Sequence, residues 1–200
     1  MEFILPSAPP ATASSFHPPL RADARRNREK LIEVATAAFA ESGVEASLEE
    51  IARRAGVGIG TLYRHFPTRE HLVEVIYRRE LEALAAAATE LGVKHPSDIA
   101  LEEWMRRFVG YIAAKRGMAS SLKILMDSNA SLFAEGSGIL RSAADGLLKA
   151  AAQEGTIRND IDTTDLLHAL SSIYSLPSSP EWRDRSNRLI GLLMDGLRRK

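Results

Sequence analysis

Side chains that could contact nucleic acid are concentrated in one short stretch of the chain. They combine hydroxyls, an imidazole and a guanidinium with a glycine that would let a DNA backbone approach closely, and they are Ile59, Gly60, Thr61, Tyr63, Arg64 and His65. The guanidinium of Arg64 fits a guanine edge, whereas the neutral donors fit phosphate oxygens. Structural roles compete with these assignments, because the Tyr63 ring could pack against a neighbouring helix and His65 could link two helices.

Further candidates for phosphate contact flank this stretch. Ser47 and Thr68 each precede a predicted helix, whose free N–H groups and dipole favour an anion, although Ser47 could act as a helix cap alone. Arg69 adds a cation in the first turn after Thr68. Arg25 and Arg26 belong to a locally basic run, which is either a solvated helix start or a second phosphate contact.

The elements that would position these side chains are two short helices, predicted over residues 48–55 and 60–65. Ser47 and Glu50 have the spacing of a capping box at the start of the first helix. The glycine-containing turn Gly56-Val57-Gly58 joins the two helices. Apolar residues within the unit can form a small shared core, and they are Ile51, Ala52, Ala55, Val57 and Leu62. This is the pattern of a helix-turn-helix over residues 47–66, whose second helix can lie in the major groove.

The rest of the chain predicts an all-α fold, because Ala and Leu are abundant and Gly or Pro interrupts the sequence at helix-length intervals. The other predicted helices span residues 22–41, 69–91, 98–116, 118–127, 138–153, 163–175 and 181–198. Residues 1–20 hold five of the nine prolines and are predicted to be a disordered tail.

The stretch from residue 25 to residue 77 resembles the N-terminal domain of the TetR family of transcriptional regulators. Four of the family's steps occur in order, as Gly56-Val57, Thr61-Leu62-Tyr63, His65-Phe66 and Arg69-Glu70-His71-Leu72. The resemblance implies that the positions in contact with the DNA backbone are Ser47, Thr61, Tyr63, His65 and Arg69. The residues that contact bases vary among family members, so the resemblance does not decide whether Ile59 and Arg64 contact bases.

The resemblance also implies a domain organisation for the whole chain. A three-helix helix-turn-helix domain over residues 21–80 would be joined through a long helix to a helical effector-binding and dimerisation domain over residues 81–200. Because one helix-turn-helix makes too few contacts for tight binding, a homodimer on a palindromic double-stranded operator is expected.

The last two predicted helices supply a candidate dimer interface, because the last is apolar on most sides. The candidate residues are Leu166, Leu170, Ile173, Leu189, Ile190, Leu193 and Leu197. The resemblance implies the same pair of helices. The alternative is that both helices only complete the core of a monomer.

The middle of the chain gathers pliable and aromatic side chains that suit an irregular cavity. They are Trp104, Met105, Phe108, Tyr111, Leu122, Met126 and Phe133. As a pattern they could equally form core, but the resemblance implies an effector cavity in this layer. Its apolar lining predicts an uncharged hydrophobic or aromatic effector, a small molecule whose identity the sequence does not give.

Composition limits the remaining possibilities. The 200 residues carry 26 basic and 26 acidic groups and no cysteine, which excludes disulfides and thiolate metal sites. Without an apolar run of membrane length, a histidine spacing typical of metals or a readable catalytic set, we expect a cytoplasmic protein that is not an enzyme and has no cofactor. The favoured function is a repressor released from DNA by its effector. The alternatives are a binding module without DNA readout and, least favoured, a helical-bundle enzyme.

Overall fold

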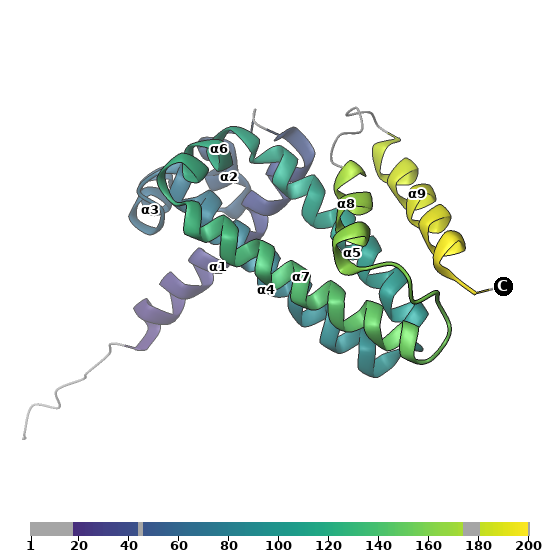
Figure 1. Ribbon diagram of the computed structural model, residues 1–200. Helices are drawn as coiled ribbons and strands as arrows, with labels where there is room; N and C mark the ends of the chain where they lie inside the picture. Colours follow the sequence, from purple (N-terminus) through teal and green to yellow (C-terminus); the bar gives the residue numbers. More distant parts are fainter. Residues whose placement is uncertain (1–17, 44–45, 174–180, 200) are drawn as a thin grey trace, which may run out of the picture.

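Helices make up nearly all of the part of the chain that the structure, a computed structural model, describes: residues 18–43, 46–173 and 181–199 (Figure 1). Those ranges contain no β-strand, so the all-α prediction is confirmed. The helices are α1 (Pro18–Ser42), α2 (Leu48–Ala55), α3 (Ile59–His65), α4 (Arg69–Lys94), α5 (Ser97–Gly117), α6 (Ala119–Ser128), α7 (Ala130–Gln153), α8 (Thr163–Ser172) and α9 (Trp182–Leu197).

Polar side chains at the helix starts explain why several helices begin where they do. The Ser47 hydroxyl accepts a hydrogen bond from the Glu50 N–H (3.0 Å), and the Thr68 hydroxyl accepts one from the His71 N–H (3.1 Å). A reciprocal capping box links Asp162 and Asp165 at the start of α8. These caps satisfy N–H groups that have no partner inside the helix, which fixes the local boundary.

The first helix begins earlier than the sequence predicts. Residues 18–20, which the sequence assigns to the disordered tail, belong to α1, whereas residues 1–17 lie outside the described part of the chain. In Figure 1, α1 (purple) runs away from the body toward its N-terminal end.

The seventh helix differs most from prediction, because it starts at Ala130 and not at residue 138. Asn129 caps it by accepting a hydrogen bond from the Leu132 N–H (3.4 Å). Gly136 lies inside the helix, where a Cβ atom would come within 2.7 Å of the Tyr77 hydroxyl and of a Leu81 methyl group. This glycine therefore marks close packing of α7 on α4 and not the approach to a helix start.

The core joins α4, α5 and α7, which pack against one another along the centre of the molecule (Figure 1). Trp104 of α5 is fully buried, and its indole N–H donates to the carbonyl of Leu84 in α4 (2.9 Å). The long helix α4 also contacts α1, so that it runs from the helix-turn-helix region into the C-terminal bundle. The domain boundary predicted near residue 80 falls inside this continuous helix.

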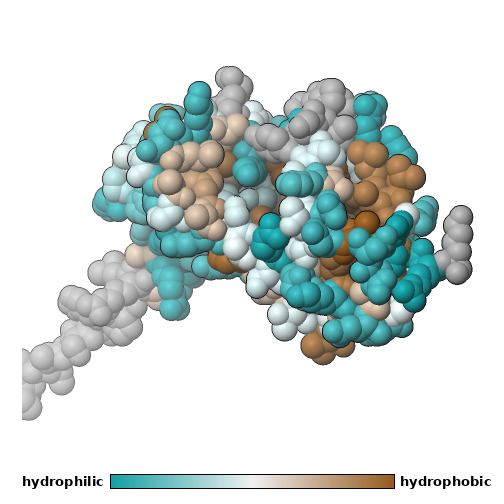
Figure 2. All heavy atoms as spheres, viewed as in Figure 1, coloured by the Kyte–Doolittle hydropathy of each residue, from teal (hydrophilic) through white to brown (hydrophobic). Residues whose placement is uncertain are grey.

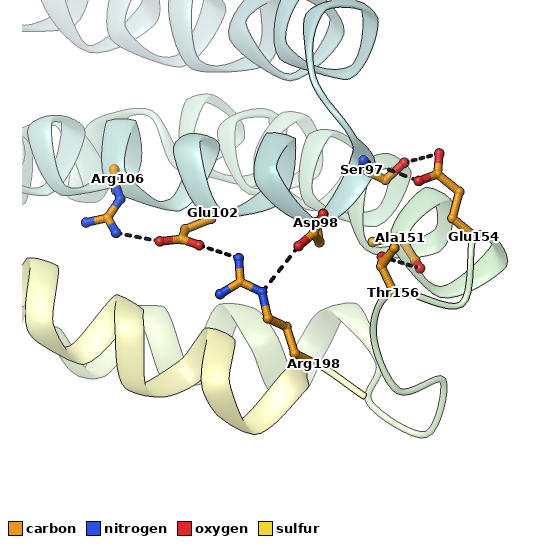
Figure 3. A network of polar contacts seen from close by, with 8 residues as sticks. All are labelled: Ser97, Asp98, Glu102, Arg106, Ala151, Glu154, Thr156 and Arg198. Atoms are coloured by element: carbon orange, nitrogen blue, oxygen red, sulfur yellow. Dashed lines mark hydrogen bonds and ion pairs between the residues drawn. The ribbon is translucent and has the colours of Figure 1, made fainter. Parts of the chain in front are cut away.

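A polar cluster fixes the C-terminal end of α9 onto α5 (Figure 3). The guanidinium of Arg198 donates to Asp98 (3.2 Å) and to Glu102 (2.8 Å), and Glu102 also accepts from Arg106 (2.5 Å). Beside it, the Ser97 hydroxyl donates to Glu154 (2.5 Å), which connects the start of α5 to the end of α7. The hydrogen bonds of Arg198 and Ser97 join segments that are distant in sequence.

Candidate DNA-binding surface and effector cavity

The turn between α2 and α3 is set by backbone geometry. Gly56 ends α2 with φ of 70°, a left-handed conformation that residues with a side chain rarely adopt. The N–H of Gly56 donates to Arg53 and that of Val57 to Ala52, both at 3.0 Å. These hydrogen bonds close the end of α2 and aim the chain into α3.

Helix α3 is held to the body by one face only. Leu62 is fully buried, as is Phe66 directly after the helix. The predicted contact residues keep exposed surface: Ile59 (37% exposed), Tyr63 (45% exposed), Gly60 and Arg64 face solvent, whereas Thr61 and His65 are partly exposed. All six therefore present surface that DNA could reach.

The capping box predicted at α2 forms only in part. Ser47 caps the helix, but the carboxylate of Glu50 pairs with Arg53 in two hydrogen bonds of 2.7 and 2.8 Å. The Arg53 hydrogen bond is the main cause that lowers the pKa of Glu50. The Glu50 carboxylate binds this guanidinium and not the Ser47 N–H, because a hydrogen bond between two charged groups is stronger than one to a neutral donor.

The sequence assigns Arg69 to a phosphate contact, but this side chain packs within the helix-turn-helix domain. That domain, formed by α1 to α3 and the start of α4, is called the head below. The Arg69 guanidinium donates to the carbonyl of Ala46 (2.6 Å) and lies 4.8 Å from the centre of the Phe39 ring. This side chain therefore links the start of α4 to the loop before α2 and to α1. No local pattern indicates this role, because Phe39 and Ala46 are brought to Arg69 by tertiary packing.

The basic run on α1 remains exposed. Arg25 and Arg26 both face solvent, and Arg26 pairs with Asp23 one turn earlier. Arg28, two residues on, lies over the Phe66 ring at 5.3 Å, which places this part of α1 next to the end of α3. The run therefore lies beside the helix-turn-helix.

A cavity of about 430 Å³ opens in the C-terminal bundle, within the range of small-molecule sites. Side chains from α4 to α8 line it, and they are Tyr77, Phe108, Tyr111, Ile112, Lys115, Met126, Phe133, Ser137, Leu140, Arg141, Leu167 and Ser171. Of the seven residues that the sequence assigns to an effector cavity, the structure places four in this lining: Phe108, Tyr111, Met126 and Phe133.

The other three residues expected there lie elsewhere. Trp104 and Met105 are fully buried in the core and Leu122 is nearly so, and none of them lines the cavity. The indole hydrogen bond of Trp104 to α4 holds that ring in the helix interface. Helical spacing predicts the face of α5 and α6 on which these residues lie, but not their depth.

Two side chains that the sequence analysis missed, Tyr77 and Lys115, give the cavity much of its polar character. Burial raises the pKa of Tyr77 and of Tyr111, whose hydroxyls are hydrogen-bonded to each other. Burial lowers the pKa of Lys115, whose Nζ lies 5.9 Å from the centre of the Tyr111 ring. Lys115 follows Tyr111 by one helical turn, which is the signal that could have revealed it.

The residues expected at a dimer interface divide into two groups. Leu166, Leu170, Ile173, Ile190 and Leu197 are buried inside the single chain, where α8 packs on α7 and α9 packs on α5. Leu189 and Leu193 are partly exposed, and the neighbouring Leu192 is 67% exposed. Figure 2 shows apolar atoms gathered over α9 and beside α8, so this face is apolar but narrower than expected.

Comparisons with known proteins agree with the all-α fold and the helix-turn-helix. Residues 31–76 match the family model for bacterial regulatory proteins of the tetR family, and residues 96–199 match the model for the SbtR-like transcriptional regulator C-terminal domain. The crystal structure of the TetR transcriptional regulator SCO0520 from Streptomyces coelicolor is 43% identical over 86% of this chain and 98% of that one, with a TM-score of 0.76. This chain belongs to the TetR family of transcriptional regulators.

Other relatives support the TetR assignment. A TetR transcription regulatory protein from Mycobacterium vanbaalenii is 33% identical over 90% of this chain and 100% of its own, with a TM-score of 0.70. An HTH-type transcriptional regulator of Staphylococcus aureus is 42% identical over 64 residues, which are 32% of this chain. The match to that curated relative spans only 35% of its length.

The TetR family is a family of regulators and not of enzymes. In the described part of the chain, no group of three or more His, Cys, Asp or Glu side chains could hold a metal ion. None of the described helices is both long enough and apolar enough to cross a membrane.

Proposed function

We propose that this TetR-family regulator is a homodimeric, sequence-specific repressor that binds a palindromic operator in double-stranded DNA and is released by a small hydrophobic or aromatic effector. It acts in the cytoplasm, where the operator is accessible. The observation that carries the proposal is the exposure of α3, which is anchored through Leu62 while Gly60, Tyr63 and Arg64 face solvent.

Within this proposal, Arg64 reads a base edge and Ile59 contributes an apolar contact, while the hydroxyls of Ser47, Thr61 and Tyr63 and the imidazole of His65 bind phosphates. Arg25 and Arg26 add phosphate contacts from α1. Arg69 acts indirectly, because its hydrogen bond to Ala46 and its stacking on Phe39 hold the head in shape.

The effector acts on the connection between the cavity and the head. Tyr77 lines the cavity and belongs to α4, the helix that begins next to α3. An effector that binds one arrangement of α4 and α5 better than another changes the separation of the two recognition helices in the dimer. DNA affinity then falls because the helices no longer match successive major grooves.

The test is selection of bound fragments from a random DNA pool by the full chain. A palindromic consensus whose half-sites are about one helical turn apart, with binding that weakens as salt rises, supports the proposal. Recovery of no consensus, with weak binding that salt does not change, overturns it and favours a helical module without DNA readout.

A further inference from the structure

The lining of the cavity contains a feature that an uncharged ligand would not use. Among its described lining residues are two cations, Lys115 and Arg141, and no carboxylate. The remaining lining is largely aromatic and aliphatic. Such a cavity offers an apolar body a place to bind and presents positive charge to one end of it.

The two cations are not equivalent. Arg141 is exposed and donates to the Thr164 hydroxyl (3.0 Å). A hydrogen bond from Lys149 is the largest cause that lowers the pKa of Asp145, and the charge of Arg141 adds to that effect. Arg141 thus interacts with the Asp145 carboxylate, and Lys115 is half-buried with its Nζ 5.9 Å from the centre of the Tyr111 ring.

The tyrosine pair defines the end of the cavity near Lys115. The rings of Tyr77 and Tyr111 are 6.4 Å apart, and the ring of Phe133 lies 5.2 Å from that of Tyr77. Gly136 lets α7 approach the Tyr77 hydroxyl closely, which limits how far this ring can move. The hydrogen-bonded hydroxyls of Tyr77 and Tyr111 therefore form a polar pair in the same lining as Lys115.

We infer that the effector is an aromatic carboxylic acid, whose ring lies against Phe108, Phe133 and Met126 and whose carboxylate is bound by Lys115 and by the Tyr77–Tyr111 pair. The inference rests on the proposed function, because it names the chemistry of the ligand that the cavity would take. It replaces the expectation of an uncharged effector. A carboxylate loses hydrogen bonds to water when it enters the cavity, and charge-assisted hydrogen bonds from Lys115 replace them. A ligand amine, in contrast, would be repelled by Lys115.

The test is direct binding of matched ligands to the full chain by calorimetry. Each set keeps one aromatic body, phenyl, naphthyl or biphenyl, and changes the polar group; the naphthyl set is naphthoate, naphthamide and naphthylmethylamine. At least one acid is expected to bind about tenfold more tightly than its amide, and the amines are expected to bind least. Equal or tighter binding of the amides, or no binding of any acid, overturns the inference.

A variant pair assigns the effect to one side chain. Lys115→Met keeps the length of the side chain and removes its charge, so acid binding is expected to fall about tenfold or more while amide binding is kept. Lys123→Met changes an exposed lysine on α6 outside the cavity lining and is expected to leave both unchanged. An unchanged acid affinity in Lys115→Met contradicts the assignment.

Failure of this inference and failure of the proposed function are distinguishable. If the chain binds a selected operator and neutral amides release it, the regulator stands and the carboxylate assignment fails. If no operator is found, the proposed function fails, and the calorimetric preference for acid or amide still decides the ligand chemistry.

Discussion

Gly117, the last residue of α5, lies directly against the backbone of Phe39 in α1. A Cβ atom on Gly117 would overlap the Phe39 carbonyl group, so only glycine allows the two helices to approach this closely. Lys115 of the cavity lining precedes Gly117 by two residues, and the Arg69 guanidinium lies over the Phe39 ring. The candidate cavity and the helix-turn-helix domain therefore meet at this junction.

Replacing Gly117 with alanine tests the importance of the close approach. Gly117→Ala is expected to lower the free energy of unfolding by about 1–3 kcal/mol, because the added methyl group forces α5 away from α1. Gly110→Ala is the matched control, since its Cβ atom would meet nothing within 4 Å and alanine favours helix. Urea unfolding measures both, and equal stability of the two variants would contradict the close approach.

Arg69 and Arg64 are expected to differ in what their removal changes. Arg69→Ala removes the hydrogen bond to Ala46 and the stacking on Phe39, so the free energy of unfolding should fall by about 1–3 kcal/mol, with DNA affinity reduced as a consequence. Arg64→Ala should leave the melting temperature unchanged and relax sequence preference. Thermal unfolding and operator selection measure the two effects, and a normal melting temperature for Arg69→Ala would show that its role is in binding DNA.

The basic run on α1 is expected to contribute to the salt dependence of DNA binding. Exchanging Arg25 and Arg26 for glutamine should make the slope of log affinity against log salt shallower by about 0.9 for each phosphate that is no longer neutralised. Gel shifts over a salt series measure the slope. An unchanged slope would assign the two side chains to the solvated surface.

The apolar face of α9 is expected to mediate dimerisation. Leu192→Glu puts a charge at the most exposed leucine of that face and should convert a dimer to a monomer, because an unpaired carboxylate cannot be buried at low cost. Ile124→Glu is the control, at an exposed isoleucine (55%) on α6. Light scattering after size-exclusion chromatography distinguishes the states, and a Leu192→Glu dimer would place the interface elsewhere.

The cluster around Arg198 is expected to stabilise the C-terminal bundle. Arg198→Met should lower the free energy of unfolding by about 1–2 kcal/mol, since the mostly buried Asp98 would lose this charged donor and Glu102 would lose one of its two. Arg158→Met breaks the exposed pair with Asp160 and should destabilise the protein less, because solvent screens an exposed pair. Chemical denaturation compares the two variants, and equal destabilisation would argue against a special role for the cluster.

The local elements could be predicted from the sequence because their determinants are close together in the chain. Ser47, Gly56 and Leu62 set the cap, the turn and the buried anchor of the helix-turn-helix, all within one short stretch. The predicted starts of α2 and α4 agree with the structure for the same reason. The predicted start of α7 is wrong, because Gly136 is glycine to accommodate side chains of α4, which no local pattern reveals.

The depth of a side chain and its partners depend on how the helices pack. Helical periodicity predicts the face on which a residue lies, but not whether another helix covers that face; Trp104 and Leu166 are therefore core, while Leu192 is surface. Lys115 lines the candidate cavity and Arg69 lies over the Phe39 ring only because helices distant in sequence pack together. The helices and the recognition unit are thus specified locally along the chain, whereas the chemistry of the cavity and its junction with the head arise from long-range packing.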